Sequence, residues 1–518
     1  MDLLQGIKAH ITRLFRRTYS GFMRLPRYVK RGLTTAFVLL VLFLLIDLIF
    51  PVNTGIRYSR LILSGDGKLL NAALSTDQQW RMKAEIDEVN PLLIKTLIYK
   101  EDRWFRFHPG VNPVAIARAL WQNISHGKRV SGASTITMQV ARMLEPRERN
   151  LFNKLIECFR ALQLEMHYSK NEILGLYINL LPYGGNVQGV KAASFLYFGQ
   201  EPQALSLAQV VTLAIIPNDP NHLNLGRHNT AIVKQRNIWL KKLGTFHLFD
   251  QKEMLDAIGE PLTARRYEAP KQVPHLARLL ASRYPAKPVI HTFIDARLQD
   301  FIENTVSNEV MMYRGMGVGN AAVVLVDNRK HAVVAYVGSV GFHENQYQGQ
   351  VDGAASLRSP GSALKPFLYA LAMDRGLITP KTILQDIPQN FNGYRPQNYD
   401  ETFRGRLPAS QALALSLNIP AVDLANRVGA DLFNEKLSRG GLKWIGARRK
   451  SLGLSVVLGG CGVTLSELTS LYSSLACGGT NYPLKFTTAD ATQAPVVLFS
   501  PQSSWMITEI LTGLKRPD

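Results

Sequence analysis

The stretch Glu101-Asp-Arg-Trp-Phe-Arg-Phe-His108-Pro-Gly110 brings acidic, aromatic and imidazole side chains together in one short segment. It ends a run in which Leu93 and Leu97 recur at helical spacing, and Glu101 continues the apolar face that they form. A carboxylate on such a face is partly removed from water, which favours its acting as a proton acceptor. The pattern therefore predicts a helical domain with Glu101 as a candidate general base.

The same position has a simpler interpretation. An acid near the end of a helix often forms a structural ion pair, and Arg103 and Arg106 follow Glu101 closely. By position alone this structural pairing is the more frequent case, so the function of Glu101 has to be judged from the motifs around it.

The overall composition excludes several classes of protein. The 518 residues are 46% hydrophobic and 19% charged, which supplies sizeable cores and is not the composition of a disordered chain. The net charge of +21 is typical of proteins that meet an anionic membrane surface, a phosphorylated substrate or nucleic acid. Cys158, Cys461 and Cys477 are far apart, which excludes a disulfide scaffold and a cysteine-based zinc site.

An apolar run at residues 33–50 is interrupted only by Thr34, Thr35 and Asp47. Its length is close to the roughly 20 residues that a helix needs to cross a bilayer, so it predicts one transmembrane helix. The preceding tail, residues 1–32, is rich in Lys and Arg and has one acidic residue. The positive-inside rule therefore predicts a cytoplasmic N-terminus and an exported body, which argues against a nucleic-acid partner.

The body of the chain shows two different sequence patterns. Residues 60–250 show helical periodicity, with Asn90-Pro91 as a typical helix start, and predict an all-α domain. Residues 288–518 mix helical stretches with strands, including a buried hairpin within residues 321–337, and predict an α/β domain. The proline-containing residues 251–287 between them are interpreted as a linker.

Three further motifs follow Glu101 in order. They are Ser131-Gly-Ala-Ser-Thr-Ile-Thr-Met-Gln139-Val-Ala-Arg142, Lys154-Leu-Ile-Glu157 and Glu172-Ile-Leu-Gly-Leu-Tyr-Ile-Asn179. Together with the segment 101–110, this set resembles the glycosyltransferase domain of peptidoglycan polymerases, which has an all-α, lysozyme-like fold. The resemblance extends over about residues 60–250.

The resemblance implies roles for individual residues. Glu101 matches the general base, which takes a proton from the 4-hydroxyl of a lipid-linked acceptor while that oxygen attacks the anomeric carbon of the growing chain and expels lipid pyrophosphate. Arg142, Lys154 and Arg160 would give charge-assisted hydrogen bonds to the pyrophosphate. Glu157 matches a second essential carboxylate that positions basic groups or a divalent cation, and no other cofactor is implied. The residues that match the substrate site are Asp102, Phe105, His108, Ser134, Thr135, Gln139, Arg142 and Lys154.

Some positions depart from the family pattern. Ala133, Met138 and Asn153 replace a glycine, a glutamine and an arginine, but no catalytic carboxylate is lost. Activity with altered donor affinity is therefore expected. A glycoside hydrolase is the chemical rival, because paired carboxylates also suit glycan cleavage. The anchor and the basic cluster favour a lipid-pyrophosphate substrate, and the implied partners are lipid II, the nascent glycan strand, the membrane and other cell-wall synthesis proteins.

A second motif, Arg358-Ser-Pro-Gly-Ser362-Ala-Leu-Lys365-Pro366, places a serine and a lysine on one face at a helix start. Ser416-Leu-Asn418 follows it. Behind the glycosyltransferase motifs, these elements resemble a bifunctional class A penicillin-binding protein, most of all the 1C subtype. The resemblance implies that Ser362 is the nucleophile, that Lys365 is its base, and that Ser416 and Asn418 relay a proton and contact substrate. It also implies the bacterial inner membrane, with periplasmic catalytic domains.

The third element of that family, Lys-Thr-Gly or a close variant, does not occur in the sequence. The transpeptidase domain is therefore expected to be truncated, with an unpaired sheet edge, and to be defective. Two alternatives stay open: a working bifunctional enzyme completed by another polypeptide, and a non-catalytic membrane-anchored cell-wall scaffold. The scaffold predicts that Glu101→Gln changes nothing, whereas the glycosyltransferase predicts near-complete loss of polymerisation.

Overall fold

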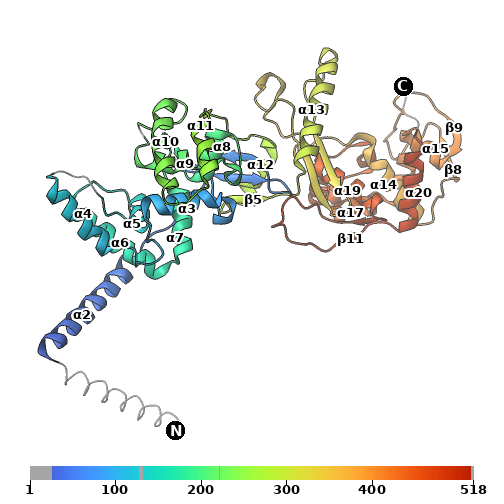
Figure 1. Cartoon of the computed structure of the whole chain (residues 1–518). Helices are drawn as coiled ribbons and strands as arrows, with labels where there is room; N and C mark the ends of the chain where they lie inside the picture. The colour runs from blue at the N-terminus through green and yellow to red at the C-terminus, as the bar shows by residue number, and fades with distance from the viewer. Residues whose placement is uncertain (1–25, 128–131, 221, 515–518) are drawn as a thin grey trace, which may run out of the picture. The chain divides into compact units, whose positions relative to one another are not determined.

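The computed structural model describes residues 26–127, 132–220 and 222–514, which form two compact units (Figure 1). Unit 1 contains the described residues up to Tyr58 and residues 75–267, and unit 2 contains residues 59–74 and those from Glu268 onward. Most of the predicted basic tail, together with Ser131, lies outside the described residues.

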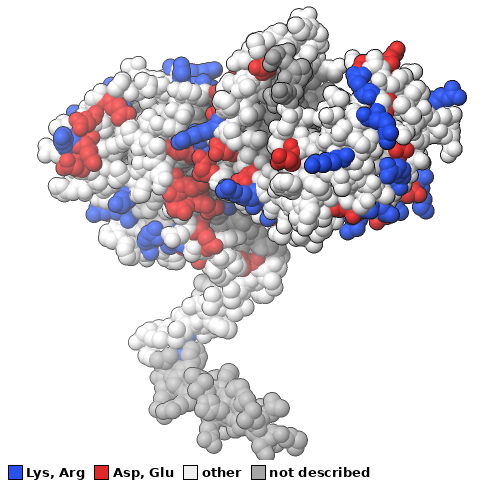
Figure 2. All heavy atoms as spheres, turned by 90° about the vertical axis from the view of Figure 1, so that its right-hand side faces the viewer, with Lys and Arg blue, Asp and Glu red and all other residues white. Residues whose placement is uncertain are grey.

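Helix α2 (Arg27–Ile49) is, among the described residues, the one helix long and apolar enough to cross a membrane. It begins before the predicted run at residue 33, because Pro26 precedes its first residue and the Lys and Arg side chains that follow favour helix, which outweighs the cost of Gly32. Figure 2 shows that α2 presents a largely uncharged surface. An N-terminal helix of this kind supports membrane anchoring.

Unit 1 is helical, as predicted. Its helices are α3 (Pro91–Glu101), α4 (Pro113–Ser125), α5 (Ile136–Leu144), α6 (Leu151–His167), α7 (Lys170–Leu180), α8 (Val190–Phe198), α9 (Leu207–Ile215), α10 (Asn229–Gly244) and α11 (Gln251–Gly259). The short strands β3 (Trp80–Arg81) and β4 (Val187–Gln188) pair in parallel. Asn90 caps α3 by accepting a hydrogen bond from the N–H of Leu92, with Pro91 in the first turn, as the sequence predicts. Helix α5 packs on α6 and α7, which brings the sequence motifs together.

Unit 2 mixes strands and helices, again as predicted. Its strands are β1 (Arg60–Leu63), β2 (Leu69–Ala73), β5 (Val289–His291), β6 (Val323–Asp327), β7 (Ala332–Val337), β8 (Ile383–Asp386), β9 (Gly405–Pro408), β10 (Thr480–Asn481) and β11 (Val496–Val497). Its helices are α12 (Pro274–Arg283), α13 (Ala296–Tyr313), α14 (Lys365–Asp374), α15 (Ala409–Ala414), α16 (Asn418–Val428), α17 (Ala430–Arg439), α18 (Lys443–Arg448), α19 (Leu465–Ala476) and α20 (Pro501–Thr512). Strands β6 and β7 form the expected antiparallel hairpin. Helix α14 lies in the centre of a core to which Phe367, Leu368 and Tyr369 contribute fully buried side chains.

The units divide differently from the predicted boundaries. Residues 59–74 group with unit 2 rather than with the helical domain, because β1 pairs in parallel with β5 far along the chain. The segment interpreted as a linker, 251–287, contains α11 and α12, and its residues up to Tyr267 belong to unit 1. Pairing between distant segments leaves no local period in the sequence, which is why the periodicity did not predict it.

Candidate active sites

Glu101 is the last residue of α3, and its side chain is 11% exposed. Its carboxylate accepts hydrogen bonds from the ammonium group of Lys100, which is almost fully buried, and from the side-chain amide of Gln139, whose Nε2 lies 2.9 Å from Oε2. Gln139 belongs to α5, so the first two sequence motifs meet at this carboxylate. A shielded carboxylate held by two donors is well oriented for proton transfer.

The ion pair of the simpler interpretation is present, but its partner is Lys100 and not Arg103 or Arg106. The guanidinium of Arg103 lies 4.9 Å from the ring centroid of Tyr99, and Arg106 donates a 3.0 Å hydrogen bond to Asn171. Both arginines follow the end of α3 in an irregular turn, so helical spacing no longer places them beside Glu101.

The pKa of Tyr177 on α7 is affected by the charges around this carboxylate. Burial, then Glu101 and then Tyr183, raise the pKa of Tyr177 well above its usual value of 10, and the cation of Arg142 opposes the shift. Arg142 is half-buried on α5. The structure therefore brings Arg142 into the electrostatic surroundings of Glu101, where an anionic substrate group would benefit from it.

Asp102 fastens the turn after α3 to the start of α5. Its Oδ2 lies 2.9 Å from Nε2 of His108 and accepts a 3.1 Å hydrogen bond from the N–H of Ile136, the first residue of α5. The helix dipole favours a carboxylate at that end. Asp102, His108, Phe105 and Thr135 are all buried, so their contacts within the protein are structural. Their predicted contacts with substrate stay predictions.

Gly110 closes the same segment against α6. Its φ of +84° is left-handed, and a Cβ there would lie 2.8 Å from the carbonyl oxygen of Ala161. Its own carbonyl accepts a hydrogen bond from the hydroxyl of Thr135. Only glycine allows this close approach, which positions the motif 101–110 between α5 and α6.

Lys154 joins two other motifs. Its Nζ donates hydrogen bonds of 2.6 Å to Oε2 of Glu157 and 2.7 Å to Oγ of Ser134. Glu157 is 12% exposed, whereas Lys154 is 38% exposed and can contact a ligand. The structure thus brings together three residues that the sequence predicted as site residues.

Arg160, the third predicted pyrophosphate contact, is already engaged. It forms an ion pair of 3.0 Å with Glu145 and donates a 2.6 Å hydrogen bond to the carbonyl of Phe50, at the end of α2. Nearby, Oδ2 of Asp47 lies 2.9 Å from Nε2 of His167 on α6. The end of α2 is therefore held by polar contacts to α6.

The carboxylates of this site offer few ligands to a divalent cation. In the residues that the structure describes, no group of three or more His, Cys, Asp and Glu side chains could hold a metal ion. Glu157, the carboxylate that the resemblance would assign to a cation, is paired with Lys154. One carboxylate beside an ammonium group is a poor donor set for Mg²⁺ or Ca²⁺. The residues described here do not fit a resident cation, and no step below depends on one.

Several positioning residues were not predicted from the sequence. Lys170, in the first turn of α7, donates to Oε1 of Glu165 at 2.7 Å and to the carbonyl of His108 at 2.6 Å. Thr137 on α5 donates to the same oxygen of Glu165 at 2.6 Å. Ser169 and Glu172 form a capping box that marks the start of α7, but only the fold shows which acid the lysine contacts.

The serine motif of unit 2 also has the expected local structure. Ser362 lies in the 3₁₀ turn Gly361–Leu364 and is exposed, and α14 begins immediately after that turn, with Pro366 in its first turn. Lys365, the first residue of α14, is 1% exposed. The serine hydroxyl is therefore open to a substrate at the start of a buried helix.

Lys365 reaches the second element of the motif set. Its Nζ donates a 2.7 Å hydrogen bond to Oδ1 of Asn418 and lies 3.3 Å from Oγ of Ser416. Burial lowers the pKa of Lys365 from 10.5 to about 8, which makes the neutral amine accessible as a base. Ser416 has a φ of +53°, a left-handed conformation that is uncommon for serine and frequent at functional sites.

Comparisons with known proteins identify the family of each domain. Residues 66–244 match the family model of the transglycosylase domain, and residues 321–518 match that of the penicillin binding protein transpeptidase domain. Penicillin-binding protein 1C of Escherichia coli (strain K12) is 36% identical over 95% of this chain and 64% of its own length. Penicillin-binding protein 1F of Bacillus subtilis (strain 168) is 27% identical over 92% of this chain and 70% of its own length.

Among solved structures, penicillin-binding protein 1A from Haemophilus influenzae aligns with a TM-score of 0.48 at 17% identity, over 90% of this chain and 81% of that chain. The chain spans 64% of the length of the 1C relative, and its transglycosylase match precedes its transpeptidase match. On the two family matches and the 1C relative, and with an apolar helix before the two domains in the described residues, the chain belongs to the class A penicillin-binding proteins.

Proposed function

We propose that this protein polymerises lipid-linked disaccharide-peptide, lipid II, into peptidoglycan glycan strands. The observation that carries the proposal is the carboxylate of Glu101, shielded from water and held by Lys100 and Gln139. Glu101 takes the proton of the acceptor 4-hydroxyl, whose oxygen forms a bond to the anomeric carbon. The bond from that carbon to the lipid pyrophosphate breaks with inversion, and Arg142 and Lys154 stabilise the charge of the leaving group.

The test is polymerisation of labelled lipid II by the full chain in detergent micelles. Glu101→Gln removes the base and keeps the shape, so we expect the rate to fall by about 10²–10⁴-fold. Glu253→Gln, an exposed position on α11, is the matched control and should leave the rate unchanged. Undiminished polymerisation by Glu101→Gln would contradict the proposal, and absence of polymerisation in the unaltered chain would favour the scaffold.

We further propose that the N-terminus is cytoplasmic and that both catalytic units lie on the periplasmic side of the inner membrane. Arg27, Lys30 and Arg31 in the first turns of α2 support this orientation, because basic residues are retained on the cytoplasmic side. Alkaline phosphatase fused after Tyr58 should be active, since this reporter folds only outside the cytoplasm. An inactive fusion at that point would contradict the orientation.

A second activity, serine acylation by penicillin, is favoured by the contacts of Lys365 with Ser416 and Asn418. The expectation that this module is defective stays a prediction. Labelling of the membrane-inserted chain with a fluorescent penicillin, beside Ser362→Ala, distinguishes a working acylation site from a defective one. A band that depends on Ser362 would contradict the defect, whereas no band on a chain that still polymerises lipid II would support it. Contacts with other cell-wall synthesis proteins also stay a prediction.

A further inference from the structure

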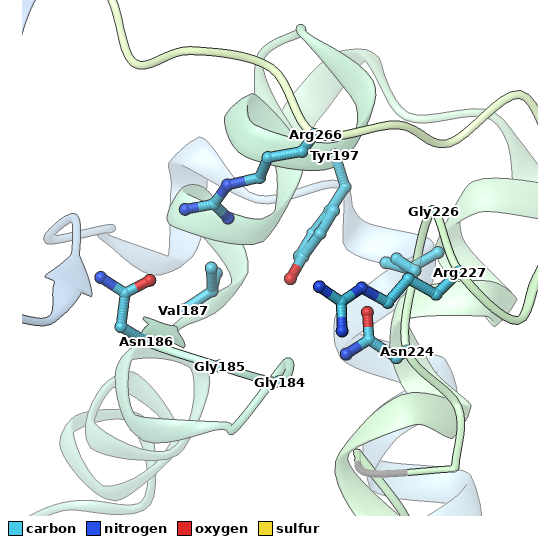
Figure 3. A pocket seen from close by; sticks show the side chains of 10 residues that line it. Gly184, Gly185, Asn186, Val187, Tyr197, Asn224, Gly226, Arg227 and Arg266 are labelled. Carbon is cyan, nitrogen blue, oxygen red and sulfur yellow. The ribbon is translucent and has the colours of Figure 1, made fainter.

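A cavity of about 460 Å³ in unit 1 involves none of the motif residues discussed above. Three parts of the unit line it: the glycine-rich turn 184–187 after α7, the segment 224–227 before α10, and Tyr197 of α8 together with Arg266 (Figure 3). Its volume lies in the range of small-molecule sites and is larger than a single ion requires.

The charged side chains that line the cavity are all cationic. Arg227 and Arg266 line it, and no Asp or Glu does. In the described part of the chain, no ion pair joins either guanidinium to a carboxylate. Two cations that share one cavity repel each other, and an anion bound between them would remove that cost.

Both arginines act on one hydroxyl. Figure 3 shows their guanidinium groups on opposite sides of the Tyr197 side chain, and the guanidinium of Arg266 lies 5.5 Å from its ring centroid. Burial raises the pKa of Tyr197, and both Arg266 and Arg227 oppose that shift. The hydroxyl makes a long hydrogen bond of 3.3 Å to the carbonyl of Tyr183, and it can turn about its C–O bond toward a ligand.

The floor of the cavity is bare backbone. Gly184 and Gly185 have φ values of +94° and +55°, and a Cβ at Gly185 would meet no atom within 4 Å. A Cβ at Gly184 would lie 3.3 Å from the carbonyl oxygen of Pro220, so glycine lets the two loops approach. A ligand can therefore come close to the main chain, beside the apolar side chains of Val187 and Leu225.

We infer that this cavity binds an oxyanion, a carboxylate or a phosphate carried on a larger uncharged body, through Arg227 and Arg266. The planar fork of each guanidinium matches either oxyanion in a bidentate way. The apolar wall and the spare volume accept the uncharged body. If the proposed function holds, two sources supply this chemistry: the carboxylates of the peptide on the glycan, and pyrophosphate. The binding itself does not depend on that function.

The experiment measures binding of two probes to the full chain in detergent: inorganic pyrophosphate, and a lipid-free disaccharide-pentapeptide. We expect one of them to bind and the other to bind at least 10-fold more weakly, which identifies the source. Arg227→Gln and Arg266→Gln should each weaken the bound probe by at least 10-fold. Arg265→Gln is the matched control, because Arg265 stacks on Tyr267 and does not line the cavity.

Two further variants keep the outcomes separate. Arg266→Lys retains the charge and loses the fork, so intermediate affinity is expected even if the glutamine variants fold poorly. Glu101→Gln should bind the probe with unchanged affinity. The binding experiment can therefore be interpreted even if the polymerisation proposal fails. Binding of neither probe, or unchanged affinity in both Arg227→Gln and Arg266→Gln, would overturn the inference.

Discussion

The side-chain amide of Gln139 on α5 donates a 2.9 Å hydrogen bond to Oε2 of Glu101 at the end of α3. A second hydrogen bond joins the same two segments, because the carboxylate of Asp102 accepts a hydrogen bond from the N–H of Ile136 at the start of α5. The orientation of the proposed base therefore depends on how α5 is held.

Loss of the Gln139 amide should slow polymerisation without unfolding the protein. In Gln139→Ala the carboxylate of Glu101 keeps Lys100 and loses its second donor, so its position becomes less defined. We expect kcat to fall by about 10–100-fold, with a smaller change in KM, because a misplaced base affects the reacting geometry. Gln251→Ala on the exposed start of α11 should leave kcat unchanged. A wild-type rate in Gln139→Ala would show that the hydrogen bond does not position the base.

Lys154 should contribute mainly to donor binding. Lys154→Gln removes a half-exposed cation and leaves Glu157 and Ser134 without their shared donor. The KM for lipid II is expected to rise about 10-fold or more, because a charge-assisted contact to phosphate is lost. Lys154→Arg keeps the charge and should recover part of the affinity. Equal KM values for the glutamine and arginine variants would contradict this role.

Asp102 should contribute to stability. Asp102→Ala leaves the buried Nε2 of His108 and the N–H of Ile136 without their acceptor. Removing a charged acceptor from buried donors costs about 2–3 kcal/mol, so the free energy of unfolding should fall by that amount. Thermal or denaturant unfolding of unit 1 measures it, and Asp256→Ala on the exposed face of α11 serves as the control. A variant as stable as the control would show that these contacts are weak.

If Ser362 is labelled by penicillin, which would contradict the predicted defect, the rate of acylation should depend on the protonation of Lys365. The neutral amine is the base, and its pKa is about 8, so acylation should be half-maximal near pH 8 and level off about one pH unit higher. Folding stability should also rise with pH in this region. The pKa of Lys365 is about 8 in the folded protein and 10.5 in the unfolded chain, so the unfolded chain binds more protons between these two values. The contribution of Lys365 to stability therefore increases from pH 8 toward 10.5. Fluorescent-penicillin labelling from about pH 6 to about pH 10, with Ser362→Ala as the blank, measures the rate on both sides of this pKa. A labelling rate that does not change through pH 8 would contradict the role of Lys365.

The sequence predicted much of the site because its signals are local. The helix start at Asn90-Pro91, the helical periodicity around Gln139 and the helix start close to Ser362 are all confirmed. Each depends on residues within a few positions of one another, such as a capping side chain or a proline in the first turn. The partners of Glu101 were different: Gln139 was predicted as a substrate contact, and Lys100 was not predicted at all.

The sequence by itself determined the order of the anchor, the helical domain and the α/β domain, and it determined the motifs that each domain contains. The tertiary structure alone decided that Lys170 meets Glu165, that β1 pairs with β5, and that Arg227 and Arg266 share one cavity. The physical reason is distance along the chain. Periodicity and capping act within one or two turns, whereas these contacts depend on the path of the whole backbone and on which buried polar groups it brings together.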